Sequence, residues 1–356
     1  MVELKSSITN QGKTERMESI YLIESGCYLK KDGECLKIMK DRQTIQTIPA
    51  TGLEQLTLAG RTSLTGPVLD FLINHKVDTV FMSPDGRFRA RLLLDDSGHV
   101  RLRQKQYRRL GETAAKLAFA RNIVASKLEN QARLLLRRGS QYNNEELRKI
   151  AIQIKALKKR IPETDDMDIL RGIEGSGAKL FFSSFSLLIL NSDFFFHGRN
   201  RRPPRDPVNA LLSFVYTLFT NEVLNAIRVS GLDPYLGALH EVASGRPSLA
   251  CDLVEEWRVF AERLVLGLIN KKIVKPHDFI FRKKKEQAGG LRPVEMKPAV
   301  YRALIKTWRR QLDLRLHYPP TGLETSIRWI IHGQSRRMVE WLKDERENYE
   351  PFLMNR

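Results

Sequence analysis

The feature that most constrains the fold of this chain is an abrupt change of pattern near residue 97. Before it, short apolar runs are separated by glycine and proline turns, including an Asp32-Gly33 pair between two such runs, which is typical of β-strands and hairpins. After it, apolar residues recur at helical spacing. The change predicts an α+β multidomain protein with a small β-sandwich at 17–97 and an all-α domain at 98–356. Residues 1–16 show neither pattern and are predicted to be a flexible tail.

The second part is predicted to contain several amphipathic helices. The clearest helix start is Asp206-Pro207, because an aspartate cap followed by proline at the first helical position favours a helix N-terminus. Glycines at 172, 175 and 177 predict that another element packs closely against the helix that carries them. The apolar periodicity places helices at 112–138, 144–160, 166–190, 207–229, 249–270, 298–316 and 323–346, with a basic connector at 100–109 and a hairpin at 273–295.

The charge balance indicates a polyanionic partner. The chain carries 60 Lys and Arg against 41 Asp and Glu, a formal net charge of +19. Nucleic acid is the first candidate and an anionic membrane surface the second. Membrane association is poorly supported, because there is neither an uninterrupted apolar run long enough to span a bilayer nor a basic amphipathic helix with an aromatic face. Three cysteines without metal-binding spacing and no signal-peptide core predict a reduced, cytoplasmic protein.

An acidic cluster is the strongest candidate for chemistry. On the helix predicted at 249–270, Asp252, Glu255 and Glu256 fall at positions i, i+3 and i+4, which places three mutually repelling carboxylates on one face. Glu174 and His240 lie in segments that are otherwise small or apolar. Two or three carboxylates with one imidazole suit Mg²⁺ or Mn²⁺. A solvated acidic face is the alternative for the helix, and a core or surface histidine is the alternative for the imidazole.

A basic loop precedes the helix predicted at 207–229. It holds four arginines and two prolines directly before the helix N-terminus. Arginine forks and the N–H groups of a helix start both bind phosphate oxygens, although a solvated basic loop is an open alternative. Together with the acidic cluster, the loop predicts a phosphodiester held over a divalent ion. The arginines are Arg199, Arg201, Arg202 and Arg205.

Several motifs closely resemble those of the CRISPR-associated integrase of spacer acquisition, CRISPR-associated protein one. They occur in the order and at the spacing typical of that family, and the resemblance covers roughly residues 17–282. The segment after Arg282 resembles the family less well, and residues 1–16 resemble nothing. The motifs that carry the resemblance lie at 171–175, 201–216, 231–240 and 245–258.

The resemblance implies roles for individual residues. It implies catalytic metal ligands at Glu174, His240 and Glu255, with Asp252 beside them as a supporting group or alternate ligand, and Mg²⁺ or Mn²⁺ as cofactor. Arg258 is expected to bind DNA together with the four arginines of the loop. The residues expected to support DNA binding from the helix after the loop are Asn209 and Tyr216, with core packing the stronger alternative for Tyr216.

The resemblance also implies a reaction and partners. The β-sandwich would form a homodimer, and two dimers would be bridged by a small ferredoxin-like adaptation subunit, CRISPR-associated protein two, in a prokaryotic cytoplasm. The complex would insert short double-stranded prespacer DNA into a CRISPR repeat by attack of each 3′-hydroxyl on a phosphodiester. Two rival functions fit the same residues: a metal-dependent nuclease that repairs branched DNA, and a catalytically silent DNA-binding scaffold.

Overall fold

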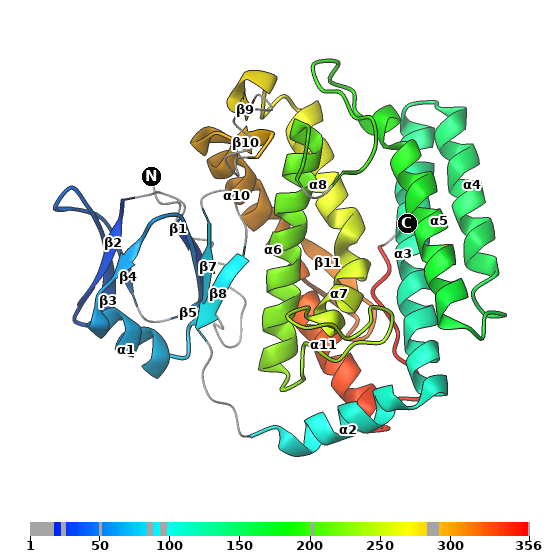
Figure 1. Cartoon of the computed structure of the whole chain (residues 1–356), viewed down its shortest axis with the longest axis horizontal. Coiled ribbons are helices and arrows are strands. Elements are labelled where there is room, and N and C mark those ends of the chain that lie inside the picture. Colours follow the sequence, from blue (N-terminus) through cyan, green and yellow to red (C-terminus); the bar gives the residue numbers. More distant parts are fainter. Residues whose placement is uncertain are drawn as a thin grey trace. The chain divides into compact units, whose positions relative to one another are not determined.

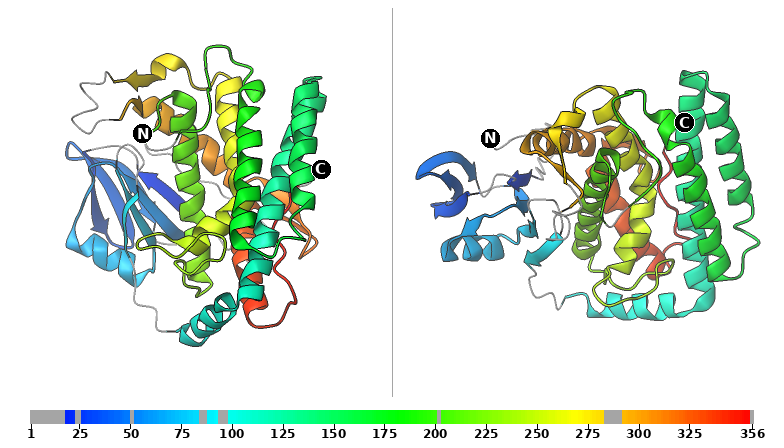
Figure 2. Two further views of the ribbon diagram at one scale, coloured as in Figure 1. Left: turned by 45° about the vertical axis from the view of Figure 1, so that its right-hand side comes forward. Right: turned by 45° about the horizontal axis from the view of Figure 1, so that its top comes forward.

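The computed structural model describes residues 18–22, 26–49, 52–83, 88–92, 98–200, 203–282 and 292–354. It divides into two compact units (Figures 1 and 2). The first contains residues 1–96, 277–281 and 295–309, and the second contains 97–276, 282–294 and 310–356. The main division therefore falls next to the change of pattern in the sequence, but two later segments join the first unit. The tail predicted at residues 1–16 lies outside the described residues.

The first unit is built on two four-stranded sheets. One has the order β1-β5-β7-β8, with β1, β5 and β7 parallel and β8 antiparallel; the other has the order β4-β3-β2-β6. The Asp-Gly hairpin is present between β2 and β3, with Gly33 at a φ of +55°. The strands are β1 (Glu18–Leu22), β2 (Tyr28–Asp32), β3 (Cys35–Lys40), β4 (Gln43–Pro49), β5 (Leu53–Ala59), β6 (Ser63–Leu64), β7 (Asp78–Met82) and β8 (Phe88–Leu92).

Apolar side chains from both sheets and from helix α1 (Gly66–Asn74) form the core of this unit. Leu29, Leu56 and Phe71 are at most 2% exposed and belong to one hydrophobic cluster, so the predicted strand-rich N-terminal part is confirmed. The later segment enters the same unit through helix α10 (Pro298–Leu312), where the buried indole Nε1 of Trp308 donates a hydrogen bond of 2.9 Å to the hydroxyl of Tyr21. Such a contact between residues distant in sequence is not visible in local periodicity.

The second unit is mainly helical, and α3, α4 and α5 lie side by side in it (Figures 1 and 2). Helix α6 has the bounds that the sequence predicts, with Asp206 accepting a hydrogen bond of 2.8 Å from the backbone N–H of Asn209. The helices are α2 (Val100–Gly111), α3 (Thr113–Gln141), α4 (Glu145–Lys159), α5 (Met167–Ser183), η1 (Phe185–Leu188), α6 (Pro207–Val229), α7 (Ser248–Leu253), η2 (Val254–Trp257), α8 (Arg258–Asn270) and α11 (Ile327–Leu342).

Three expectations about this part of the chain were wrong. The connector predicted at 100–109 is helix α2. The helix predicted at 249–270 is interrupted by the 3₁₀ turn η2. The start of the helix predicted at 323–346 is instead strand β12 (Leu323–Ser326), which pairs with β11 (Arg315–Tyr318), so the unit is not all-α. The hairpin predicted at 273–295 is present as η3 (Pro276–Asp278), β9 (Phe279–Phe281) and β10 (Val294–Met296).

Helix α6 is the central apolar helix of the second unit. Among the described residues, α6 is the one helix whose length and apolar composition would allow it to cross a membrane. Its most apolar 18-residue stretch has a mean hydropathy of 1.3, and 83% of that stretch is buried inside the protein. Its side chains pack against α7, α8 and α11. The apolar composition of α6 is therefore accounted for by packing in the core.

Candidate active site

Two of the predicted carboxylates converge on one buried cation. Glu174 on α5 and Glu255 in η2 both form ion pairs with the ammonium of Lys127 on α3; the Glu255 Oε2 lies 2.6 Å from the Lys127 Nζ. The side chain of Lys127 is 7% exposed. The close approach of α5 to α3 depends on Gly177, where a Cβ atom would lie 2.2 Å from the Leu128 Cδ2. The close packing predicted for the three glycines of α5 is therefore present at Gly177, whereas at Gly172 and Gly175 an added Cβ would meet no atom within 4 Å.

The environment of Glu255 keeps its carboxylate ionised. Burial raises the pKa of Glu255, but the charges of Arg258, Lys127 and His240 outweigh burial and hold the pKa below the usual range of a glutamate. The Arg258 Nη2 lies 2.9 Å from the Glu255 Oε1, and its Nε lies 3.2 Å from both carboxylate oxygens. In the same way, burial lowers the pKa of the Lys127 ammonium, and the two carboxylates outweigh that effect and raise it. The site therefore pairs anionic ligands with fixed cations.

Asp252 orients His240. The Asp252 Oδ1 lies 2.8 Å from the His240 Nδ1, and its carboxylate also accepts hydrogen bonds from the backbone N–H groups of Ala238, Leu239 and His240 at 2.6, 3.2 and 2.9 Å. Because Asp252 is fully buried and both its oxygens are engaged, it acts as an acceptor that leaves the His240 Nε2 for another partner. The loop reaches α7 closely at Gly237, where a Cβ would lie 2.6 Å from the Ser248 backbone.

The donor set of Glu174, Glu255 and His240 fits a divalent ion. Among the residues that the structure describes, no group of three or more His, Cys, Asp or Glu side chains is arranged to hold a metal as it stands. The reason is visible in the contacts: the Lys127 ammonium lies between the two carboxylates, and the imidazole is bound to Asp252. The Lys127 ammonium already binds both carboxylates, so their oxygens can converge on one cation. A set of carboxylate oxygens and an imidazole nitrogen suits Mg²⁺ or Mn²⁺.

Glu256 does not share the face of Glu255, contrary to the sequence prediction. Its carboxylate is fully buried and accepts hydrogen bonds from the Gln334 Nε2 at 2.9 Å, from the Phe352 backbone N–H at 2.7 Å and from the Tyr349 hydroxyl. Burial raises its pKa to about 7. The helical spacing failed here because η2 is a 3₁₀ turn, which places successive side chains at larger angles than an α-helix does.

The arginine loop is described only in part. Arg201 and Arg202 lie outside the described residues, and Arg205 is exposed. The Arg199 guanidinium donates to the Asn209 Oδ1 at 2.6 Å and lies 5.4 Å from the centre of the Tyr216 ring. A hollow of about 670 Å³ opens beside it, lined by basic, aromatic and small residues: Ala178, Lys179, Phe182, Ser183, Phe196, His197, Gly198 and Arg199.

Asn209, Tyr216 and Arg258 are turned into the protein. Asn209 is fully buried and binds the loop backbone at Gly198 through its Nδ2 at 2.9 Å. Tyr216 is 8% exposed and donates its hydroxyl to the Glu262 Oε1 at 2.8 Å. Arg258 lies 4.5 Å from the centre of the Tyr216 ring while it binds Glu255. The burial of Tyr216 favours the core-packing alternative for it, whereas the side chain of Arg258 is 19% exposed.

Two buried side chains next to the predicted residues were not predicted from the sequence. Lys127 lies between Ser126 and Leu128 in a predicted helix that carries several other basic residues, so nothing in the sequence singled it out. Glu262 is fully buried beneath Tyr216, and burial raises its pKa to about 7.

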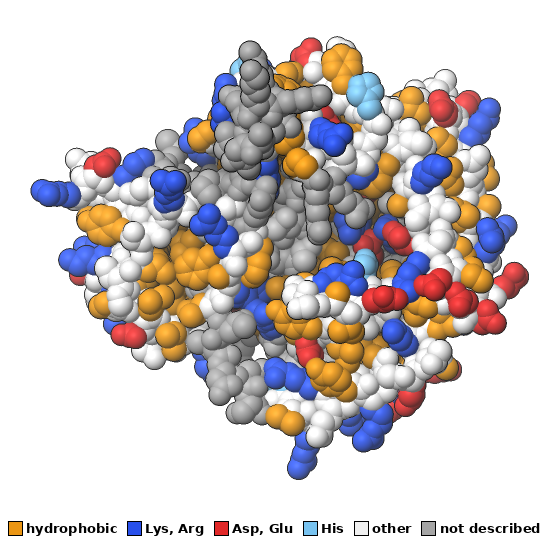
Figure 3. All heavy atoms as spheres, in the orientation of Figure 1, with side chains coloured by type: hydrophobic (Ala, Val, Ile, Leu, Met, Phe, Trp, Pro, Cys, Tyr) orange, Lys and Arg blue, Asp and Glu red, His pale blue; other side chains and the backbone are white. Residues whose placement is uncertain are grey.

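On the visible face of the helical unit, acidic, basic and histidine side chains lie beside one another (Figure 3).

Comparisons with known proteins agree with this fold. The chain matches the family model of the CRISPR associated protein Cas1 over residues 20–310. A CRISPR-associated endonuclease Cas1 of Thermus thermophilus is 34% identical over 338 residues, covering 94% of this chain and 97% of the relative. A casposase bound to integration product has a TM-score of 0.80 at 23% identity, covering 93% of this chain and 92% of the casposase.

A chain of a Cas6-RT-Cas1–Cas2 complex has a TM-score of 0.83 at 22% identity, and the match covers 99% of this chain and 37% of that one. At these identities the structural likeness shows the fold. The family match and the relative from Thermus thermophilus also show family membership, because both matches extend over most of the sequence. The chain therefore belongs to the family of the CRISPR-associated protein Cas1.

Proposed function

We propose that the protein is a divalent-metal-dependent DNA integrase and endonuclease that joins the 3′-hydroxyl ends of short prespacer DNA to phosphodiesters of a CRISPR repeat. The observation that carries the proposal is the convergence of Glu174 and Glu255 on one buried cationic centre. The relatives named as endonucleases and the casposase bound to integration product support this class of reaction.

In this proposal Glu174, Glu255 and His240 hold the ion. A bound Mg²⁺ or Mn²⁺ would neutralise charge on the attacked phosphate and polarise the attacking oxygen. Asp252 fixes the ring of His240 through Nδ1, and Arg258 keeps Glu255 anionic and in place. The attacking 3′-hydroxyl loses its proton as a new P–O bond forms, and the leaving 3′ oxygen gains one as the old P–O bond breaks. The number of phosphodiester bonds is unchanged, so no nucleotide cofactor is needed.

The arginine loop would hold the DNA backbone. Arg201, Arg202 and Arg205 are proposed phosphate contacts, in keeping with the net charge of +19. Arg199 is anchored to Asn209 and Tyr216, so we assign it to the base of the loop, where it fixes the loop to α6. We propose that the hollow beside it, which has aromatic and basic lining, also contacts the DNA.

We also propose the assembly that the family resemblance implies. The first unit would form a homodimer, and a small Cas2 subunit would bridge two dimers. The Cas6-RT-Cas1–Cas2 complex, which contains a chain of the same fold, supports a Cas2 partner. Light scattering at micromolar concentration tests the first step. A species of twice the 41.1 kDa chain mass is expected, and a monomer would contradict the proposal.

Removing arginines from the loop should change the salt dependence of DNA binding. For Arg201→Ala and Arg202→Ala we expect weaker duplex binding, with the log–log salt slope reduced by about 0.9 per lost phosphate contact. Arg346→Gln is the matched control, since its guanidinium is already paired with Glu340. Fluorescence anisotropy at several salt concentrations measures the slopes, and loop variants with the wild-type slope would remove these residues from the interface.

The function is tested by incubating the protein with a short duplex, a supercoiled plasmid carrying a repeat, and the small partner subunit, with Mg²⁺, Mn²⁺ or a chelator. Joined product with either metal and none with the chelator is the expected result. Cutting of branched DNA without joining would favour the repair nuclease instead. Tight duplex binding without any cutting would favour the silent scaffold.

A further inference from the structure

We infer that Glu256 and the C-terminal segment 349–354, here called the clasp, position Glu255 for metal binding. The inference rests on the proposed function, because it assigns Glu255 to the metal site. Glu255 and Glu256 are neighbours in η2, yet their side chains leave this turn toward different partners: Glu255 toward Lys127 and Arg258, and Glu256 toward the clasp. The clasp therefore holds the turn through the residue that directly follows the proposed ligand Glu255.

The carboxylate of Glu256 is the main attachment. It is fully buried and accepts from three donors, two in the clasp and one on α11: the Phe352 backbone N–H, the Tyr349 hydroxyl and the Gln334 Nε2. A buried carboxylate is costly unless its oxygens are satisfied. These donors therefore fix both the orientation of Glu256 and the position of the clasp.

The backbone and the next side chain of the turn are held as well. The Asn130 Nδ2 donates to the Glu256 carbonyl at 3.3 Å and to the Phe352 carbonyl at 3.2 Å, and the Asn130 Oδ1 accepts from the Met354 N–H at 2.8 Å. The Trp257 ring stacks on Phe352 with centroids 5.1 Å apart and an interplanar angle of 10°. Both residues that follow Glu255 are thus bound to the clasp.

Helix α3 links this attachment to the metal ligands. Lys127, which binds Glu174 and Glu255, and Asn130, which binds the clasp, are three residues apart and so lie on the same side of α3. A four-residue 3₁₀ turn has few hydrogen bonds of its own. Contacts from α3 and the clasp therefore fix the backbone of η2, and with it the position of the Glu255 carboxylate.

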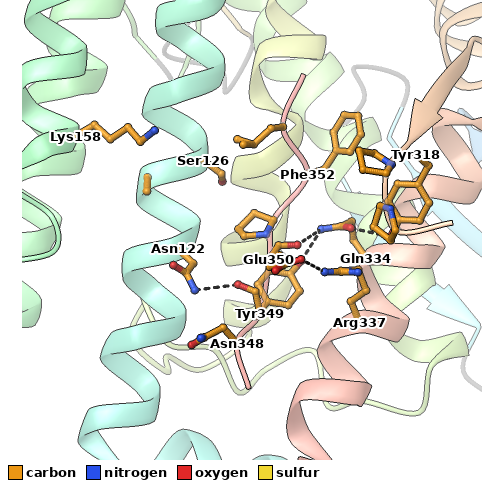
Figure 4. A pocket seen from close by; sticks show the side chains of 15 residues that line it. Asn122, Ser126, Lys158, Tyr318, Gln334, Arg337, Asn348, Tyr349, Glu350 and Phe352 are labelled. Carbon is orange, nitrogen blue, oxygen red and sulfur yellow. Dashed lines mark hydrogen bonds and ion pairs between the residues drawn. The ribbon is translucent and has the colours of Figure 1, made fainter. Parts of the chain in front are cut away.

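Hydrogen bonds and aromatic packing both hold the clasp, but one side of it is not filled by protein atoms. A cavity of about 590 Å³ borders it, lined by Asn122 and Ser126 of α3 and by Tyr349 and Phe352 of the clasp, among others (Figure 4). With this space beside it, the clasp can shift when its bonds to Glu256 are weakened. A shift of the turn would move Glu255 from its position, and metal sites tolerate displacements of only about 0.5 Å.

The test measures Mn²⁺ affinity by calorimetric titration of the full-length protein, so that it does not depend on catalysis. Tyr349→Phe and Glu256→Gln each weaken one attachment while conserving shape. Both should bind Mn²⁺ about tenfold more weakly, the low end of the effect of residues that support metal ligands. Glu350→Gln is the matched control: it lies in the clasp but pairs with Arg337 rather than Glu256, and it should bind like wild type.

Thermal unfolding of each variant accompanies the titrations. Weaker Mn²⁺ binding at 25 °C by variants that remain folded at that temperature supports the positioning role. Wild-type affinity in folded Tyr349→Phe and Glu256→Gln would overturn it, and so would a wild-type protein that binds no Mn²⁺. A wild type that binds Mn²⁺ but joins no DNA would refute the proposed function while leaving the positioning result intact.

Discussion

Alanine in place of Glu174 or of His240 should reduce DNA joining by about 10³-fold or more while duplex affinity changes by less than about threefold. A metal ion contributes several kcal/mol of transition-state stabilisation, and about 4 kcal/mol corresponds to three powers of ten in rate. Both side chains are proposed ligands, and neither belongs to the arginine loop that would supply affinity. Single-turnover rates of joining measure the effect, with anisotropy for the affinity.

The control for this pair is Glu241→Ala. Glu241 follows His240 directly, but its side chain is 70% exposed and pairs with Arg171. We expect it to join DNA at nearly the wild-type rate. Full activity in Glu174→Ala or His240→Ala would remove that residue from the site, whereas equal loss in the Glu241 control would point to damage of the loop instead.

Lys127→Met should destabilise the metal-free protein by about 3 kcal/mol, and Mn²⁺ should restore much of that loss. Removing one partner of a buried ion pair leaves an uncompensated charge and costs about 3–5 kcal/mol; here Glu174 and Glu255 would both be left facing one another. A divalent ion can replace the ammonium, since both bind the same oxygens. Denaturant unfolding in chelator and in Mn²⁺ measures the two free energies.

The control and the pH dependence make this prediction specific. Lys158→Met removes a lysine that pairs with Glu129 but is 37% exposed, and it should cost less than about 1 kcal/mol with or without metal.

In wild type, the pKa of Glu255 is lowered, so its pairing stabilises the fold above the ordinary glutamate pKa, and this stabilisation is lost as pH falls. At lower pH, the free energy of unfolding of Lys127→Met should come closer to that of wild type. Protonation of Glu174 or Glu255 relieves the repulsion between these two carboxylates in the variant. A Lys127→Met protein as stable as wild type in chelator would contradict this account.

The sequence predicts those parts of the fold that local chemistry determines. The bounds of α6 follow from the cap at Asp206-Pro207, and the β2–β3 hairpin follows from its Asp-Gly turn. The close packing of α5 follows from Gly177. The break at η2 could not be predicted in this way, because the residues around it favour a continuous helix and only contacts with distant elements hold the 3₁₀ turn.

The candidate site was predictable to the extent that residue type carries the chemistry. Residue types alone grouped Glu174 and His240 with the acidic cluster on the helix predicted at 249–270, and the family resemblance then singled out Glu174, His240 and Glu255 as ligands. The separation of Glu256 from them depends on Gln334, Tyr349 and Phe352, which lie far along the chain in segments without a motif. In the same way, the role of Lys127 exists only once α3, α5 and η2 are packed together.

We propose that metal held by Glu174, Glu255 and His240 drives attack by a 3′-hydroxyl, and a comparison of two prespacer duplexes tests this proposal. One ends in 3′-hydroxyls and the other in 3′-deoxy nucleotides, each incubated with the repeat plasmid, the partner subunit and Mg²⁺ or Mn²⁺. We expect covalent joining of the hydroxyl duplex only, and no joining in chelator. Plasmid cutting at the same rate with both duplexes, without joined product, would contradict it and identify hydrolysis as the reaction.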